Sequence, residues 1–357
     1  MKMKSLQLLV FASALSLLFS CRKNAEPIDP TSKSPADDVT MKALASQLPA
    51  LGPGFARAFG INNSGAIAGS ATDPNGKIVA FVLKNDNAWY SDEEVRSNGL
   101  PVIRFSINDP GDIAGSKANG IGITPMLWRN GQAFELQTVP GQQYGEVFDM
   151  NNAGQMVGEC LNGNYVTPTS MRASLFSLNG PAIDLGTLGG TRAVASGINE
   201  NGQIVGGAET ASGETHAFLY ENNVMHDLGT LGGTFSNAIA INNRGEIVGR
   251  SSLANGIAHA FLYKDGVMTD LGTLGGATSA AFDINDKGEV VGLSVTSTGQ
   301  PRGFLYKDGV MTDLGALGGL GSFAASINNK SEVVGYYTTL GGVVHGFIYR
   351  DGQMYSL

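Results

Sequence analysis

The stretch SNAIAINNRGEIVGRSSLANGIAHAFLYKDGVMTDLGTLGG, residues 236–276, decides the fold, because versions of it recur along the chain. Its Ile-Asn pair returns as Ile-Asn or Met-Asn, with 46, 43, 48, 43, 43 and 43 residues between successive asparagines. The asparagines of these seven copies are Asn62, Asn108, Asn151, Asn199, Asn242, Asn285 and Asn328. A nearly fixed period of this length indicates a repeat architecture.

Each copy is expected to contain about four short strands. In the quoted stretch, residues 242–245 (Asn-Asn-Arg-Gly) and 264–266 (Lys-Asp-Gly) carry the residues that tight turns favour. Residues 260–263 place apolar side chains on both faces of the strand between those turns. Neighbouring copies must cover these faces, so one copy cannot fold alone.

Repeats of about 40 to 45 residues with four antiparallel strands predict an all-β fold, a β-propeller with seven four-stranded blades over residues 55–357. An open β-solenoid is the competing fold, although its repeats are usually shorter. Leu357 ends the last copy at the position of Leu271, and residues 48–54 loosely resemble the missing Gly-Thr-Leu-Gly-Gly segment. The amino-terminal segment is therefore a candidate to complete the last blade.

The amino terminus has the layout of an export signal over residues 1–21. Lys2 and Lys4 precede an apolar run from residue 6 to 19, which is too short to span a bilayer. The run ends in Leu-Phe-Ser-Cys, which resembles the bacterial lipobox and predicts a lipid on Cys21; an ordinary signal peptide is the alternative. Residues 22–54 are rich in Pro, Ser, Asp and Ala and predict a flexible tether.

These features predict a cell-envelope lipoprotein that is held at the outer membrane or cell surface, or an extracellular protein. The net charge of −8 becomes about −10 once Lys2 and Lys4 are removed, and this disfavours nucleic acid or an anionic membrane surface as a partner. The expected membrane contact is the lipid at Cys21. If Cys21 is lipidated, Cys160 has no partner for an intramolecular disulfide and is expected to be a buried apolar residue.

The motif His-Ala-Phe at residues 216–218 and 259–261, together with the Asp-Leu-Gly-Thr-Leu-Gly-Gly runs, resembles the extracellular HAF repeat family of bacteria. The resemblance covers roughly residues 55 to 357 and is closest in the last four copies. It implies a secreted, propeller-like repeat protein. It implies no activity and no catalytic residues.

Most residues that suggest chemistry recur at one place in several copies, which favours packing or turn roles for them. His216, His259 and His345 share one position, so they are expected to be structural rather than zinc ligands. The aspartates of the Asp-Leu-Gly runs are expected to accept backbone N–H bonds at a turn; they are Asp184, Asp227, Asp270 and Asp313. Phosphate-loop, calcium-loop, nucleophile-elbow and His-Glu-x-x-His patterns are absent, so no catalytic residue, metal or cofactor is predicted.

A ligand is expected on the face that carries the loop after each Ile-Val-Gly strand, because this loop varies most between copies. The residues there that depart from the repeat are Glu159, Tyr165, Arg250, Tyr336 and Tyr337. Tyrosines beside polar groups suit sugar rings or peptides. The leading hypothesis is a binding or scaffold module for a polysaccharide or protein. The alternatives are a polysaccharide-active hydrolase or lyase and a structural spacer without a ligand.

Overall fold

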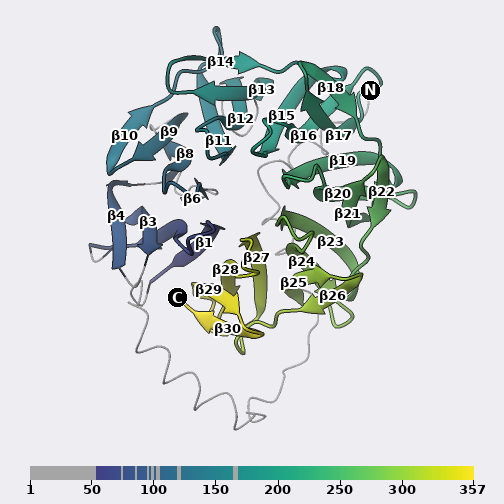
Figure 1. Cartoon of the computed structure of the whole chain (residues 1–357). Coiled ribbons are helices and arrows are strands. Elements are labelled where there is room, and N and C mark those ends of the chain that lie inside the picture. The colour runs from purple at the N-terminus through teal and green to yellow at the C-terminus, as the bar shows by residue number, and fades with distance from the viewer. Residues whose placement is uncertain are drawn as a thin grey trace. The chain divides into compact units, whose positions relative to one another are not determined.

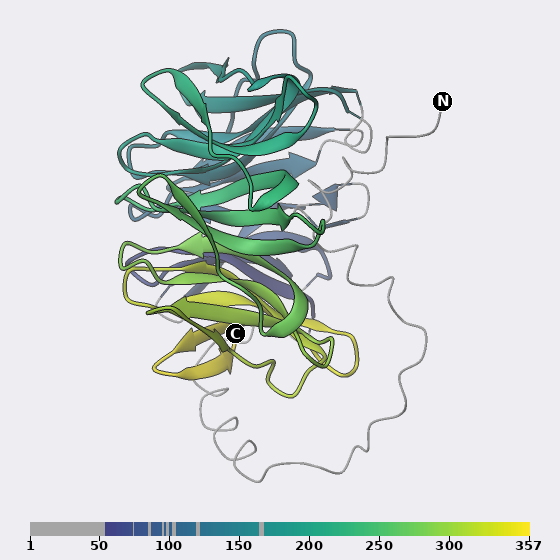
Figure 2. The same cartoon turned by 90° about the vertical axis from the view of Figure 1, so that its right-hand side faces the viewer.

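The computed structural model describes residues 54–357 except 74, 85–86, 95, 98–99, 102–104, 119–121 and 164–167. Its regular elements are all β-strands (Figures 1 and 2). Within this part of the chain there is no helix of the length and hydropathy that a membrane span needs. The predicted signal, Cys21 and most of the tether lie outside the described residues.

Within the described residues, the strands pair in seven antiparallel meanders of four, each formed by one continuous segment. Single parallel pairings join the third, fourth and fifth meanders into one twelve-stranded sheet. The first three are β1 (Ala56–Ile61), β2 (Ile67–Thr72), β3 (Ile78–Lys84), β4 (Asn87–Glu94); β7 (Ser106–Ile107), β8 (Ile113–Ala118), β9 (Ile123–Arg129), β10 (Gln132–Glu135); and β11 (Tyr144–Met150), β12 (Met156–Gly163), β13 (Pro168–Ser177), β14 (Gly180–Asp184). A two-stranded ribbon, β5 (Arg96–Ser97) and β6 (Leu100–Pro101), lies between the first two.

The other four meanders follow the same order. They are β15 (Gly189–Ile198), β16 (Ile204–Thr210), β17 (Thr215–Glu221), β18 (Val224–Asp227); β19 (Gly232–Ile241), β20 (Ile247–Leu253), β21 (Ala258–Lys264), β22 (Val267–Asp270); β23 (Gly275–Ile284), β24 (Val290–Thr296), β25 (Pro301–Lys307), β26 (Val310–Asp313); and β27 (Gly321–Ile327), β28 (Val333–Thr338), β29 (Val344–Arg350), β30 (Gln353–Ser356). The first strand of each meander lies toward the ring axis and the fourth lies at the rim (Figure 1).

Two glycines of the fifth meander show why the repeat keeps this residue. Gly266 has a φ of +82° in the turn between β21 and β22, a conformation that side chains with a Cβ resist. Gly249 lies on β20, where a Cβ would come within 2.0 Å of the carbonyl oxygen of Asn237 on β19. The Ile-Val-Gly signature therefore marks a close approach between the first two strands rather than the end of a strand.

The core lies between neighbouring meanders. The phenylalanine of the His-Ala-Phe position is at most 1% exposed in five copies; these residues are Phe81, Phe218, Phe261, Phe304 and Phe347. Phe304 of the sixth meander packs in one cluster with Val248 and Ala260 of the fifth. Burying one such side chain stabilises the fold by about 2 to 3 kcal/mol. Most of this gain requires a neighbouring copy.

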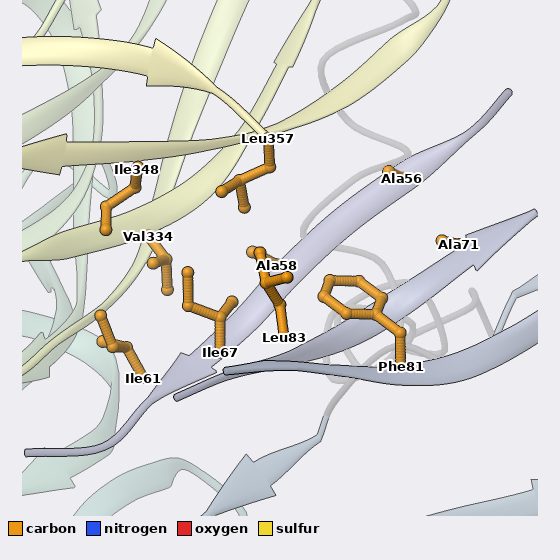
Figure 3. Packing of buried hydrophobic residues seen from close by; sticks show 10 residues of the cluster. All are labelled: Ala56, Ala58, Ile61, Ile67, Ala71, Phe81, Leu83, Val334, Ile348 and Leu357. Atoms are coloured by element: carbon orange, nitrogen blue, oxygen red, sulfur yellow. The ribbon is translucent and has the colours of Figure 1, made fainter. Parts of the chain in front are cut away.

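The ring closes by packing the first meander against the last. Val334, Ile348 and Leu357 share a buried cluster with Ala58 and Ile67 of the first meander (Figure 3). The last meander takes all four of its strands from β27 to β30. Residues 48–53, which are expected to complete the last blade, lie outside the described residues. Among the described residues, closure rests on contacts between the first and last meanders.

Two closed circles of hydrogen bonds explain the recurring Ile-Asn pair. Each repeat asparagine donates from Nδ2 to the backbone oxygen of the next one, over 2.9 to 3.4 Å, and Asn328 completes the circle by donating to Asn62. All seven are at most 4% exposed. In a second, more exposed circle, each following residue donates its backbone N–H to the side-chain oxygen of its counterpart in the next meander.

Candidate functional site

The histidines of the repeat hold a turn. His216 Nδ1 lies 2.8 Å from an Asp227 carboxylate oxygen, and the other oxygen of Asp227 accepts a 2.8 Å hydrogen bond from the backbone N–H of Gly229. His259 and Asp270 make the same pair at 2.9 Å. Backbone N–H groups bond to the four predicted aspartates over 2.7 to 2.9 Å, which confirms their role as turn acceptors.

Three of the predicted ligand residues occupy one structural position. Glu159 lies on β12, Arg250 on β20 and Tyr336 on β28, each directly after the strand glycine. Their placement in loops was wrong, because the second strand continues past the glycine that seemed to end it. They belong to the third, fifth and seventh meanders and are not neighbours around the ring. Tyr165 lies outside the described residues.

The loops that vary in sequence keep one backbone shape in five meanders. In the fourth, the N–H of Thr210 donates to the oxygen of Glu214 over 2.8 Å, and the N–H of Gly213 donates back to Thr210 over 3.0 Å. Glycine has a positive φ at the matching position of all five loops; these residues are Gly76, Gly213, Gly256, Gly299 and Gly342. The sequence variation therefore changes exposed side chains on a constant hairpin.

Tyr337 is a core residue. It is 7% exposed and belongs to the buried cluster that contains Phe347 and Val291. Its hydroxyl donates a 3.2 Å hydrogen bond to Ser356, and its ring centre lies 5.7 Å from that of His345. These contacts leave little of the side chain free for a ligand.

Glu159 and Arg250 also have partners within the fold. Glu159 is 4% exposed and stands opposite Glu146 in the pairing of β11 with β12. The Arg250 guanidinium carbon lies 5.1 Å from the ring centre of Phe235, a half-buried residue of β19. Arg250 is thus one of two arginines that stack on aromatic rings of first or second strands.

A group of stacked aromatic rings crosses the junction of the sixth, seventh and first meanders. Phe282 on β23 stacks on Phe323 of β27 with a centroid distance of 4.4 Å, and Phe323 stacks on Tyr336 at 4.8 Å. Phe59 of β1 meets Tyr336 edge-on at 6.4 Å. The three phenylalanines are half-buried, whereas Tyr336 is 8% exposed. We call Phe59, Phe282, Phe323 and Tyr336 the aromatic cluster.

Arg57 of β1 extends this stack. Its guanidinium carbon lies 4.9 Å from the ring centre of Tyr336 and 4.9 Å from that of Phe55. Burial raises the pKa of the Tyr336 hydroxyl to about 12, against the opposing effect of the Arg57 charge. Burial in turn lowers the pKa of Arg57. Tyr336 is stacked against Phe323 and Arg57, so its ring supports the cluster rather than offering a free face.

The phenylalanines of this cluster were not predicted as site residues, because each copy was compared only with the consensus of the last copies. Phe59 and Phe282 stand three residues before their repeat asparagines, as Phe105 and Phe148 do in the second and third copies; the remaining copies have Ser196, Ile239 and Ala325 there. Phe323 stands two residues earlier in its copy. First-strand aromatic residues therefore do not single out copies six, seven and one in the sequence, and the ring contacts across these copies became visible only in the structure.

Two first strands, of the third and sixth meanders, carry an aspartate two residues before the repeat asparagine. Asp283 accepts hydrogen bonds from the Ser326 hydroxyl at 2.7 Å and from the N–H of Ile327 at 2.8 Å. Asp149 accepts 2.8 Å and 3.0 Å bonds from Ser106 and Ile198. Burial raises the pKa of Asp283 to about 6, and the charge of Asp149 acts in the same direction.

A groove of about 460 Å³ lies between the last two meanders. Its Glu289 carboxylate receives bonds from Lys307 at 2.8 Å and from the Ser331 hydroxyl at 2.6 Å. Burial opposes ionisation of Glu289, yet the bonds from Lys307, Ser331 and Asn285 hold its pKa below the usual range. Ser331 adopts a φ of +68° where the other six copies have glycine, so its bond to Glu289 ties the two meanders together.

No three His, Cys, Asp or Glu side chains converge into a metal-ion site within the described part of the chain. Cys160 is fully buried, and burial raises the pKa of its thiol. The aromatic cluster with Arg57, and the Asp149 and Asp283 pair, are therefore the features that depart most clearly from the repeat.

The fold is shared with solved structures of low sequence identity. A puromycin hydrolase matches with a TM-score of 0.60 and 12% identity, over 91% of this chain and 55% of that one. A puromycin-hydrolysing peptidase of Mycobacterium tuberculosis matches with a TM-score of 0.58 and 12% identity, over 85% and 52%. The chain thus spans about half the length of these peptidases.

The propeller domain of the Trilobed protease from Pyrococcus furiosus is described as having an open velcro topology. It matches with a TM-score of 0.56 and 13% identity, over 85% of this chain and 97% of that domain. No protein-family model and no curated protein matches the chain. The structural likeness and the strand pairing confirm that the described chain is an all-β propeller.

Proposed function

We propose that the protein is a cell-envelope binding module, anchored through Cys21, that holds a polysaccharide against the aromatic cluster. The observation that carries this proposal is the set of ring contacts that joins half-buried Phe59, Phe282 and Phe323 through Tyr336 across three consecutive meanders. Aromatic rings contribute large contact area with few rotatable bonds, which suits them to bind flat sugar faces. The resemblance to HAF repeats supports an extracellular address.

The propeller scaffold sets the positions of the aromatic side chains before a ligand arrives, and this geometry favours binding. The cluster residues come from first and second strands, not from flexible segments. A preformed site loses little conformational entropy when the ligand binds. The repeat residues that look chemical, such as His259 and Asp270, are already engaged with each other.

A second candidate function is hydrolysis or lysis of a polysaccharide, and the Asp149 and Asp283 pair favours it. Glycosidases use two carboxyl groups with different proton affinities. The pKa of about 6 at Asp283 would let that group act as a general acid near neutral pH. Against this, both carboxylates accept hydrogen bonds from neighbouring first strands.

The test is a binding and turnover screen of the purified chain against envelope and host polysaccharides. Phe323→Leu removes a ring of the cluster while keeping an apolar side chain, and Phe235→Leu is the matched control on another first strand. We expect saturable binding without product, weakened about tenfold or more by Phe323→Leu and unchanged in the control. Release of cleaved sugar that stops in Asp283→Asn would establish the enzyme instead.

A further inference from the structure

Arg57 differs from the arginines that are paired within the fold. Arg129 lies 2.6 Å from Asp112, and Arg244 lies 2.5 Å from Glu246. Among the residues that the structure describes, Arg57 makes no hydrogen bond and no ion pair, and its contacts are the faces of two aromatic rings. It is a charged group whose in-plane donors are unused.

The surroundings of Arg57 make this unusual. The side chain is half-buried, and its Nε atom is fully covered without a hydrogen-bond acceptor among the described residues. Ser70, its partner in the pairing of β1 with β2, is 0% exposed, and its hydroxyl oxygen is likewise unpaired within the described chain. Buried polar atoms are nearly always satisfied in native proteins, so two such atoms on adjacent strands mark this side chain as incompletely satisfied. Because both atoms are covered, a ligand would meet the terminal nitrogens of the Arg57 guanidinium.

Aromatic rings alone do not replace a hydrogen-bond acceptor. A ring attracts a cation through its face, whereas the five N–H donors of a guanidinium point outward in its plane. Stacking on Tyr336 and Phe55 therefore fixes the orientation of the Arg57 plane and leaves its edge for an acceptor. Carboxylates fit this edge because two oxygens can accept two parallel N–H bonds.

We propose that Arg57 binds the carboxylate of an acidic sugar, so that the ligand of the aromatic cluster is a uronate-containing polysaccharide. This inference rests on the proposed binding function and names its ligand class. The carboxylate accepts from the guanidinium edge, while the apolar face of the sugar ring lies on the half-buried phenylalanines. A peptide carboxylate would use the same edge, but the half-buried rings of Phe59 and Phe282, each of which contacts one other ring of the cluster, suit a pyranose ring better.

The experiment is calorimetric titration of the full chain with hexamers of galacturonate, glucuronate and mannuronate, each compared with its methyl ester. Esterification removes the charge and keeps the sugar. We expect the wild type to prefer one free acid over its ester by about 10- to 100-fold, the range of a hydrogen-bonded charge pair. Added salt should reduce that preference.

Three variants separate the possible results. Arg57→Gln should abolish the preference for the free acid and lower ester affinity less than acid affinity, because the uncharged ester carbonyl accepts a weaker hydrogen bond from the guanidinium. Arg57→Lys keeps the charge without the planar fork and should retain part of the preference. Arg250→Gln, at the arginine stacked on Phe235, is the matched control and should change neither affinity. The thermal midpoint of each variant shows whether it is folded, and Arg57→Lys keeps the test open if Arg57→Gln is not.

Equal affinity for acid and ester, or a preference that survives Arg57→Gln, would overturn this inference. Binding of neutral polysaccharides only, weakened by Phe323→Leu, would overturn it while the proposed binding function stands. Binding of an acidic peptide and of no polysaccharide would overturn both.

Discussion

Replacing Asn328 by alanine tests whether the buried circle of asparagines closes the propeller. The Asn328 side chain donates to the backbone oxygen of Asn62 at 3.1 Å and to Glu332 at 2.7 Å, and it accepts from two backbone N–H groups of its own turn at 3.0 Å. Four hydrogen bonds at about 1 kcal/mol each give a loss near 4 kcal/mol. For a domain of this size, that corresponds to roughly 10 °C in the thermal midpoint.

Chemical denaturation followed by tryptophan fluorescence and calorimetry measures this loss. Asn242→Ala removes the same four bonds away from the closure. Asn329→Ala, in the more exposed circle, removes two side-chain bonds with Asp286 and should cost about 1 kcal/mol because water replaces these partners. Equal losses at Asn328 and Asn242 are expected. A large loss at Asn242 with none at Asn328 would refute the reasoning, since the first and last meanders would then be held together by other means.

Three further predictions follow from single contacts. Asp283→Asn tests the raised pKa of Asp283. Because burial disfavours the charged form and the folded pKa near 6 lies above the usual 3.8, the wild type should lose at most about 3 kcal/mol of unfolding free energy as the pH rises from about 4 to about 6, and the variant should not. Identical changes in the unfolding free energy of both proteins over this pH range would contradict the prediction. Gly249→Ala should cost about 3 kcal/mol or prevent folding, whereas Gly180→Ala, with no atom within 4 Å of its added Cβ, should be nearly neutral in thermal unfolding. His259→Ala should cost within about 1 kcal/mol and leave ligand binding intact in the titration; a loss of binding would give the repeat histidine a functional role.

Much of the fold could be predicted from the sequence because the repeat encodes it locally. Turn residues such as Asp265 and Gly266 take the positive φ values that their types favour. The period of the asparagines predicted the number of copies, although the reason for asparagine became visible only in three dimensions. Its side chain must reach the next copy, 43 residues away in the case of Asn242 and Asn285, and no local pattern shows that contact.

The candidate site was harder to predict because it depends on which copies become neighbours when the ring closes. Arg57 and Tyr336 are 279 residues apart in the sequence yet stack at 4.9 Å. Tyr336 was identified as an exception to the repeat, but its burial between Phe323 and Arg57 was not. Tyr337 stands beside it and points into the core, as the alternation of side chains along a strand requires.

The most direct test of this account is a crystal structure of the protein with the uronate hexamer that binds best. We predict a sugar ring against Phe59 or Phe282 and a carboxylate within hydrogen-bond distance of the Arg57 guanidinium. A ligand bound at the rim or on the constant hairpins, with Arg57 uncontacted, would contradict the assignment of the aromatic cluster as the binding site.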